Sequence, residues 1–114
     1  MAALFGGCSR HADPLTVAST ASTDRVILGE IVSQVIEKKL GQPVVRQFDI
    51  GGTGIAYEGL MLGTIGVYPD ELNAFNVVVM KETVDPNPQI VYERVRAEME
   101  RGSRILVLRP LGVR

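Results

Sequence analysis

The fold is decided by residues 15–54, which read LTVASTASTDRVILGEIVSQVIEKKLGQPVVRQFDIGGTG. The first five are mostly apolar and β-branched, and a Ser/Thr cluster follows them, so we expect a strand over Leu15–Ser19. From Asp24 the apolar residues recur with the period of one helix face. They are Leu28, Ile31, Val32, Val35 and Ile36. Thr23 is the expected N-cap of this helix, and Gly41 is its expected left-handed C-terminal residue.

The chain continues as a strand, a turn, a helix and a strand. Val44–Phe48 is a second apolar run, and the glycine-rich turn Gly51–Gly54 leads into a predicted helix over Ile55–Leu62. A third strand is predicted over Ile65–Tyr68. Alternating strands and helices predict right-handed crossovers, and therefore an α/β fold with a mainly parallel sheet flanked by helices. The loops at the carboxyl ends of such strands form the ligand crevice.

The later part of the chain is less decisive. Glu71–Met80 fits either a buried helix or a strand. The Asn87-Pro88 pair is a good N-cap and first helical residue for a charged helix over Gln89–Arg101. The inner stripe of that helix is expected to be Val91, Val95 and Met99. Ile105–Leu108 is predicted as a final apolar strand.

Charge and composition argue against nucleic-acid binding. The 114 residues carry 12 basic and 13 acidic side chains, a formal net charge of −1, without any block of like charge. With three Tyr, three Phe and no Trp, the chain has few rings on which bases could stack. We therefore expect no nucleic-acid partner, and the 46% of apolar residues fits an ordinary globular domain.

Cys8 is the single cysteine, so an internal disulfide and a Cys-type zinc site are both excluded. It follows the run Leu4–Gly7, which resembles the end of a bacterial lipoprotein signal. We expect residues 1–13 to be a flexible leader with a truncated signal and Cys8 to be the lipid anchor; an exposed spare thiol is the alternative. No apolar run approaches the roughly 20 residues of a membrane span, so membrane contact is expected only through that lipid.

Little in the sequence supports an enzyme. The Gly51–Gly54 turn places N–H groups at a helix N-terminus, but it lacks the P-loop ending and the dinucleotide fingerprint, so a tight capped turn is the simpler interpretation. His11 is the only histidine and lies in the leader, so no metal site or general base is expected. Glu30 and Glu58 are expected to be solvated or capping carboxylates rather than an acid–base pair. We predict no catalytic residue and no cofactor.

Several stretches resemble quaternary-amine substrate-binding proteins of ABC importers. The opening of that family, where Ser-Lys-x-Phe-Thr-Glu precedes Ile-Leu-Gly-Glu, is similar to Val17-Ala18-Ser19, Thr23-Asp24 and Ile27–Ile31. Its second signature, from Gly-Gly-Thr to Tyr-Pro-Glu-Tyr-Thr-Gly-Thr, is similar to Gly51-Gly52-Thr53, Tyr57-Glu58 and Val67-Tyr68-Pro69. The match continues in Val91–Arg96 and Pro110–Gly112. It covers about residues 15–112.

The resemblance implies a partial lobe of a type II periplasmic-binding-protein fold over residues 14–114, because members of this family are more than twice as long and close two lobes on their ligand. It implies a periplasmic or cell-surface lipoprotein that captures glycine betaine or a related quaternary amine for an ABC permease subunit, in osmoprotectant uptake. In the family, a box of aromatic rings holds the cationic head by cation–π attraction. Hydroxyl and basic groups hold the carboxylate.

The ligand motifs depart from the family at several positions. Thr20 and Ser22 stand where the family has Lys and Phe, and Glu71 begins the segment that replaces Tyr-Thr-Gly-Thr. The resemblance therefore implies impaired ligand binding. The crevice-side positions that still match are the candidate ligand-binding residues Ser19, Gly52 and Thr53.

Two rival functions remain open at the level of sequence. The first is a ligand-free, self-associating interaction module or an engineered single-lobe fragment. An uncovered edge at Ile105–Leu108 would be a template for pairing with a second copy in a homodimer. The second is an enzyme that binds a phosphorylated substrate at the Gly51–Gly54 turn.

Overall fold

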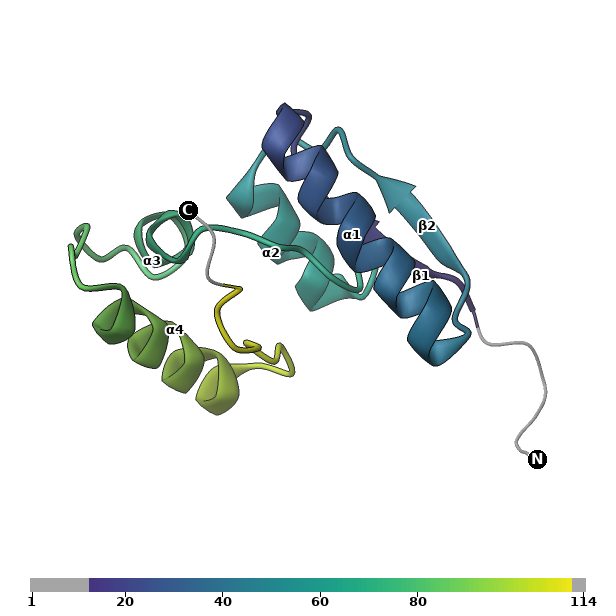
Figure 1. Cartoon of the computed structure of the whole chain (residues 1–114). Coiled ribbons are helices and arrows are strands. Elements are labelled where there is room, and N and C mark those ends of the chain that lie inside the picture. The colour runs from purple at the N-terminus through teal and green to yellow at the C-terminus, as the bar shows by residue number, and fades with distance from the viewer. Residues whose placement is uncertain (1–12, 112–114) are drawn as a thin grey trace.

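The computed structural model describes residues 13–111. Its elements run in the order β1 (Leu15–Ala18), α1 (Thr23–Leu40), β2 (Val44–Gln47), α2 (Thr53–Leu62), α3 (Leu72–Val78) and α4 (Pro88–Gly102) (Figure 1). Cys8 and His11 lie outside the described residues, so the leader and the lipid anchor stay predictions. Within residues 13–111, no helix combines the length and the apolar character that crossing a bilayer requires.

The sheet is parallel and β1 lies at its centre. β1 pairs with β2 in a register that runs from Leu15 opposite Val44 to Ala18 opposite Gln47. On the other side of β1, Val67 forms a single parallel bridge with Val17. The crossovers through α1 and through α2 therefore run in opposite directions, and right-handed connections then put these helices on opposite faces of the sheet. The predicted α/β fold with a parallel sheet and flanking helices is confirmed.

The predicted third strand, Ile65–Tyr68, is reduced to the bridge at Val67. The N–H groups of Gly66 and Val67 both donate to the carbonyl of Thr16, at 2.8 and 3.1 Å. Consecutive amides that share one acceptor break the alternation of a regular ladder. The segment nevertheless closes against β1, because the N–H of Ala18 donates to the carbonyl of Val67 at 3.0 Å.

Helix α1 confirms only part of the predicted apolar stripe: Leu28, Val32 and Ile36 are half-buried, but the fully buried residues are small. Gly29 and Ser33 are its buried residues, while Ile31 and Val35 are 54% and 53% exposed. A Cβ atom on Gly29 would lie 2.8 Å from Cε1 of Phe48, so the missing side chain is what lets the helix and the segment after β2 approach. The contact line of α1 therefore runs through Gly29 and Ser33, beside the predicted stripe.

The ends of α1 confirm one predicted cap and correct the other. Gly41 takes the left-handed conformation at φ 62°, and its N–H donates to the carbonyl of Glu37. The N-cap, however, is Ser22, and Thr23 is the first helical residue. Neither position makes a side-chain capping bond, so the sequence could not distinguish them by chemistry.

A cluster of apolar residues forms between α3 and α4. Its centre is Val91, Val95 and Met99, which confirms the predicted inner stripe of α4. The residues packed around that centre are Tyr57, Leu72, Phe75, Val79, Met80, Ile105 and Val107. The helical alternative for Glu71–Met80 is the correct one, and the side chain of Asn87 caps α4 as predicted by accepting from the N–H of Gln89.

The predicted strand at Ile105–Leu108 is wrong. Its residues alternate as in a strand: Ile105 and Val107 pack on the α4 cluster, whereas Leu106 and Leu108 are 75% and 77% exposed. No strand of the described part of the chain pairs with this segment. The proposed homodimer, which was expected to use this edge, stays a prediction.

Candidate functional site

The candidate site lies at the carboxyl edge of the small sheet. β1 and β2 both end there, and α1 and α2 begin from the loops that follow them. In parallel sheets, ligands bind outside the carboxyl ends of strands, at the point where neighbouring connections leave toward opposite faces. In this chain that point lies between β1 and Val67. Ser19 follows β1 on one side of it, and the segment from Tyr68 to Glu71 follows Val67 on the other.

Ser19 is brought to this edge, but its hydroxyl is turned toward its own chain. The residue is fully buried, and its hydroxyl donates to the carbonyl of Thr20 at 2.9 Å. The N–H of Ser19 donates to the carbonyl of Gln47, and the carbonyl of Ser19 accepts from the N–H of Ile50. Ser19 therefore connects the loop after β1 to the end of β2 and the loop that follows it. Its evident structural role is therefore to hold the edge in shape.

Gly52 and Thr53 form the beginning of α2 at the same edge. Gly52 is the N-cap, with φ 149° and ψ −169°, a conformation that essentially only glycine adopts. The hydroxyl of Thr53 donates to Oδ2 of Asp70 at 2.8 Å. This bond therefore joins the start of α2 to the segment that follows Val67.

Asp70 is a further residue of the candidate site, and the sequence analysis did not select it. Its side chain is 13% exposed, and its Oδ1 accepts from the N–H of Glu71 at 2.8 Å. Burial raises the pKa of Asp70, while the hydrogen bond from Thr53 acts in the opposite direction. A signal was present, because Asp70 follows Tyr68-Pro69 where the family signature has its glutamate.

Arg25 was missed as well. Its guanidinium, on the first turn of α1, lies 3.1 Å from Glu71, 3.7 Å from Asp24 and 3.9 Å from Asp70. Arg25 therefore links the segment after Val67 to the start of α1 through ion pairs. Burial also raises the pKa of Tyr68, so its phenol stays neutral near these charges.

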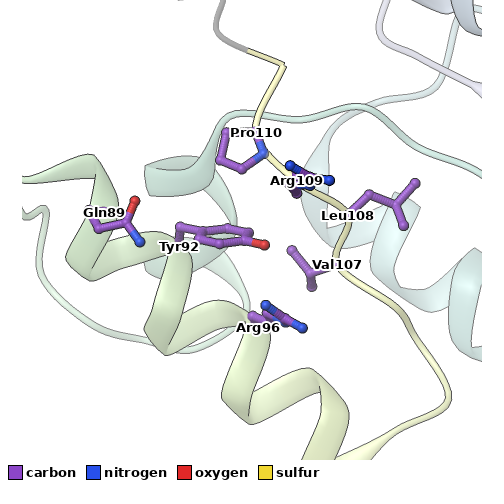
Figure 2. A pocket seen from close by; sticks show the side chains of 7 residues that line it. All are labelled: Gln89, Tyr92, Arg96, Val107, Leu108, Arg109 and Pro110. Atoms are coloured by element: carbon purple, nitrogen blue, oxygen red, sulfur yellow. The ribbon is translucent and has the colours of Figure 1, made fainter.

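One hollow in the described surface lies away from this edge. It has a volume of about 510 Å³ and is lined by Gln89, Tyr92, Arg96, Val107, Leu108, Arg109 and Pro110 (Figure 2). Two of the polar side chains that α4 contributes are already engaged on the helix, since Gln89 donates to Glu93 and Arg96 donates to Glu100. None of the candidate residues lines it. We therefore place the candidate site at the sheet edge and not in this hollow.

Metal chemistry finds no support in the part of the chain that is described. Within residues 13–111, no three His, Cys, Asp or Glu side chains gather as metal ligands would. Among residues 13–111, the groups at the sheet edge are hydroxyls, carboxylates and the guanidinium of Arg25, which can hold a solute by charge and hydrogen bonding.

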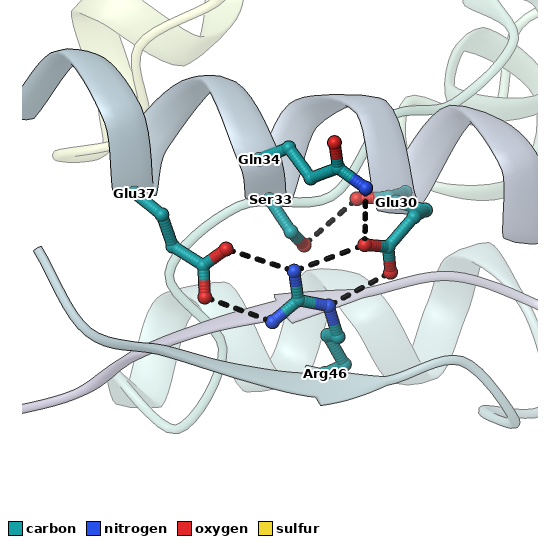
Figure 3. Close-up of polar contacts among 6 residues, drawn as sticks. Glu30, Ser33, Gln34, Glu37 and Arg46 are labelled. Carbon is teal, nitrogen blue, oxygen red and sulfur yellow. Dashed lines mark hydrogen bonds and ion pairs between the residues drawn. The ribbon is translucent and has the colours of Figure 1, made fainter.

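Glu30 belongs to an ion-pair network between α1 and β2 (Figure 3). Arg46 of β2 donates to both oxygens of Glu30, at 2.8 and 3.0 Å, and to both oxygens of Glu37, each at 2.9 Å. Gln34 adds a bond of 2.8 Å to Glu30. The hydrogen bonds from Arg46 are the main reason that the pKa of Glu30 falls from 4.5 to about 2. Glu30 is 39% exposed, as expected for a solvated carboxylate, and it also fastens α1 to β2.

The network predicts a pH dependence of stability. The folded pKa of Glu30 is depressed, so its contribution is complete above pH 4.5 and is lost as the pH falls toward about 2. Arg46→Gln should return the pKa of Glu30 toward its ordinary value and remove this part of the acid dependence. A carboxyl NMR titration of both proteins measures the shift. Arg96→Gln, which breaks the exposed pair with Glu100, is the control and should leave Glu30 unchanged.

Comparison with known proteins gives one consistent result. Residues 13–114 match the family described as the substrate binding domain of ABC-type glycine betaine transport system. Glycine betaine-binding protein YehZ of Escherichia coli (strain K12) is 28% identical over 101 residues, which make up 87% of this chain and 33% of that protein. The solved structure of apo YehZ from the same species has a TM-score of 0.76 at 27% identity, over 87% of this chain and 36% of that one. The chain spans about a third of the length of these relatives.

Proposed function

This chain belongs to the family of substrate-binding domains of ABC-type glycine betaine transport systems, and we propose that it helps to capture a small quaternary amine for such an importer. In this proposal it acts outside the cytoplasm and passes the solute to a permease subunit. The observation that carries the proposal is the family match, which extends over residues 13–114. We assign the chain no catalytic step.

The proposed contact surface is the carboxyl edge of the sheet. Gly52 and Thr53 are the proposed ligand-side residues that match the family motif, and Ser19 supports them by fixing the loops. Asp70 joins this set because its carboxylate accepts a hydrogen bond from the hydroxyl of Thr53. Lipid attachment at Cys8 and assembly into a homodimer remain separate predictions.

We expect solute binding by this chain to be weak. Thr20 and Glu71 stand where the resemblance implies a cation and an aromatic ring, and charge attraction without a desolvated aromatic cage is strongly screened by salt. Amide NMR spectra recorded during titration with glycine betaine, choline and carnitine should show millimolar binding, with the shifts centred on Ser19, Gly52 and Thr53. Binding in the micromolar range would contradict the expected weakness.

The same titration separates the proposed function from the enzyme alternative. A panel of nucleotides and sugar phosphates should leave the amides of Gly51–Gly54 unchanged. Phosphate-dependent shifts at that turn, together with no response to any quaternary amine, would contradict solute capture and favour a phosphorylated substrate.

A further inference from the structure

We infer that the outer face of α1 is a self-association surface, on which a second copy of this chain packs with its own α1 antiparallel. The inference goes beyond solute capture and does not depend on it. It places the expected homodimer on a different surface from Ile105–Leu108, the edge predicted from the sequence. It is carried by an exposed apolar stripe on α1 and by the opposite charges at the two ends of that stripe.

The outer face of α1 is apolar, although a helix at the surface usually turns polar residues to solvent. Ile27, Ile31 and Val35 are 55%, 54% and 53% exposed. They recur every four positions, so their side chains form one stripe, on the side of α1 away from the buried Gly29 and Ser33. Of the described elements, α1 packs mainly against β1 and β2, and these strands leave the stripe uncovered (Figure 1).

Opposite charges stand at the two ends of the stripe. Asp24 lies in the first turn of α1, about one turn before Ile27, and its side chain is 73% exposed. Lys38 lies in the last turn, about one turn after Val35, and is exposed. Asp24 is 3.7 Å from Arg25, and within residues 13–111 no ion pair engages Lys38. Both exposed charges can therefore meet a partner.

Antiparallel pairing makes this surface self-complementary. Asp24 and Lys38 are equally far along the helix from Ile31, and so are Ile27 and Val35. With a two-fold axis beside Ile31, that residue faces its own copy, and Ile27 faces Val35 of the second copy. Asp24 then faces Lys38 of the second copy, so an opposite-charge pair closes each end of the apolar contact.

The same charges disfavour the alternative arrangement of two copies. A parallel pair of α1 helices would bring the two Asp24 side chains together at one end and the two Lys38 side chains together at the other. Like charges that are brought together at an interface oppose association. Charge complementarity therefore selects the antiparallel pair, and it identifies a second copy of this chain as the partner that the surface fits.

The stripe is short, so we expect a weak dimer. At about 1.5 Å of rise per residue, α1 extends by about 21 Å from Asp24 to Lys38. A contact of this length lies at the small end of specific interfaces. We therefore expect a dissociation constant on the order of 100 µM, with mostly monomer at low micromolar and mostly dimer near millimolar concentration.

Analytical ultracentrifugation of the 114-residue chain over this concentration range tests the surface. A reducing agent keeps Cys8 from cross-linking two copies. The mass should rise from 12.4 kDa toward twice that value. Ile31→Ser should weaken dimerisation about tenfold or more, because Ile31 lies at the axis and each dimer loses two apolar side chains. The control is Leu62→Ser, which removes a side chain that is 79% exposed on α2 and should leave the dimer unchanged.

Two results of this experiment would overturn the inference. One is a mass that stays at 12.4 kDa up to millimolar concentration. The other is an equal loss of dimer in Ile31→Ser and Leu62→Ser, because the outer face of α1 would then have no particular part in self-association.

A charge exchange tests the antiparallel arrangement itself. Asp24→Lys and Lys38→Asp should each weaken self-association, because each variant brings like charges together at both ends of the contact. A mixture of the two variants should recover it as a heterodimer, since each end then joins a lysine to an aspartate. Added sodium chloride should reduce this recovery. If both variants dimerised like the unsubstituted chain, or if the mixture associated no better than either variant alone, the antiparallel pair would be wrong.

Discussion

Replacing Val95 with aspartate is expected to unfold the part of the chain built around α4. Val95 is 2% exposed and lies between Val91 and Met99 at the centre of the α3–α4 cluster. A carboxylate there has no polar partner, and burying an unpaired charge costs several kcal/mol or more. Since a whole domain is stable by only about 5–15 kcal/mol, this one change removes most of its stability. Circular dichroism and thermal unfolding measure the effect.

A neighbouring position on the same helix provides the control. Ala97 is exposed, so Ala97→Asp adds the same charge without burial and should change stability by less than about 0.5 kcal/mol. Val95→Ala is the graded version, and the lost methyl groups with their cavity should cost about 2 kcal/mol. If Val95→Asp melted like the unsubstituted chain, α4 would not pack on α3 through this face.

The buried face of α4, with Val95 at its centre, was predicted correctly from the sequence. Helix α4 is long, its apolar residues recur every four positions and its other faces are charged, so only one face can be buried. Helix α1 is apolar on more than one face, and its buried line is set by how closely Gly29 approaches Phe48. That approach depends on a residue outside the helix, so the periodicity of α1 alone selected Ile31 and Val35, which are exposed.

The strands and the site show a similar limit. Ile65–Tyr68 and Ile105–Leu108 have the composition of strands, but composition does not specify which neighbour accepts each N–H group. At the candidate site, the family motif pointed to Thr53, whose part in ligand binding stays a prediction. It did not reveal Arg25, because the ion pairs of Arg25 with Asp70 and Glu71 join segments that are far apart in the sequence. Such pairs depend on the crossover topology and appear only once the chain is folded.

Replacing Thr53 with valine is expected to affect both stability and solute binding. Valine keeps the shape of threonine but cannot donate to Oδ2 of Asp70, so a carboxylate that is 13% exposed loses one of its hydrogen bonds. Leaving a largely buried acceptor short of a partner costs about 1–3 kcal/mol. The same change removes a hydroxyl from the proposed contact surface, so the NMR shifts caused by choline should disappear. Thr53→Ser keeps the hydroxyl and should retain both properties.

The pH dependence identifies the bond as the cause. The folded pKa of Asp70 is already raised from 3.8 by burial, so the stability linked to this group is greatest at acid pH and falls as the pH rises through that pKa. The bond from Thr53 opposes the rise, so Thr53→Val should raise the pKa of Asp70 further. The variant should therefore lose most stability near neutral pH, where the carboxylate is ionised, and less in acid. Urea unfolding at the two pH values, with a carboxyl NMR titration of Asp70, measures both effects. An equal loss at both pH values would mean that the valine disturbs packing and that Thr53 does not hold the charge of Asp70.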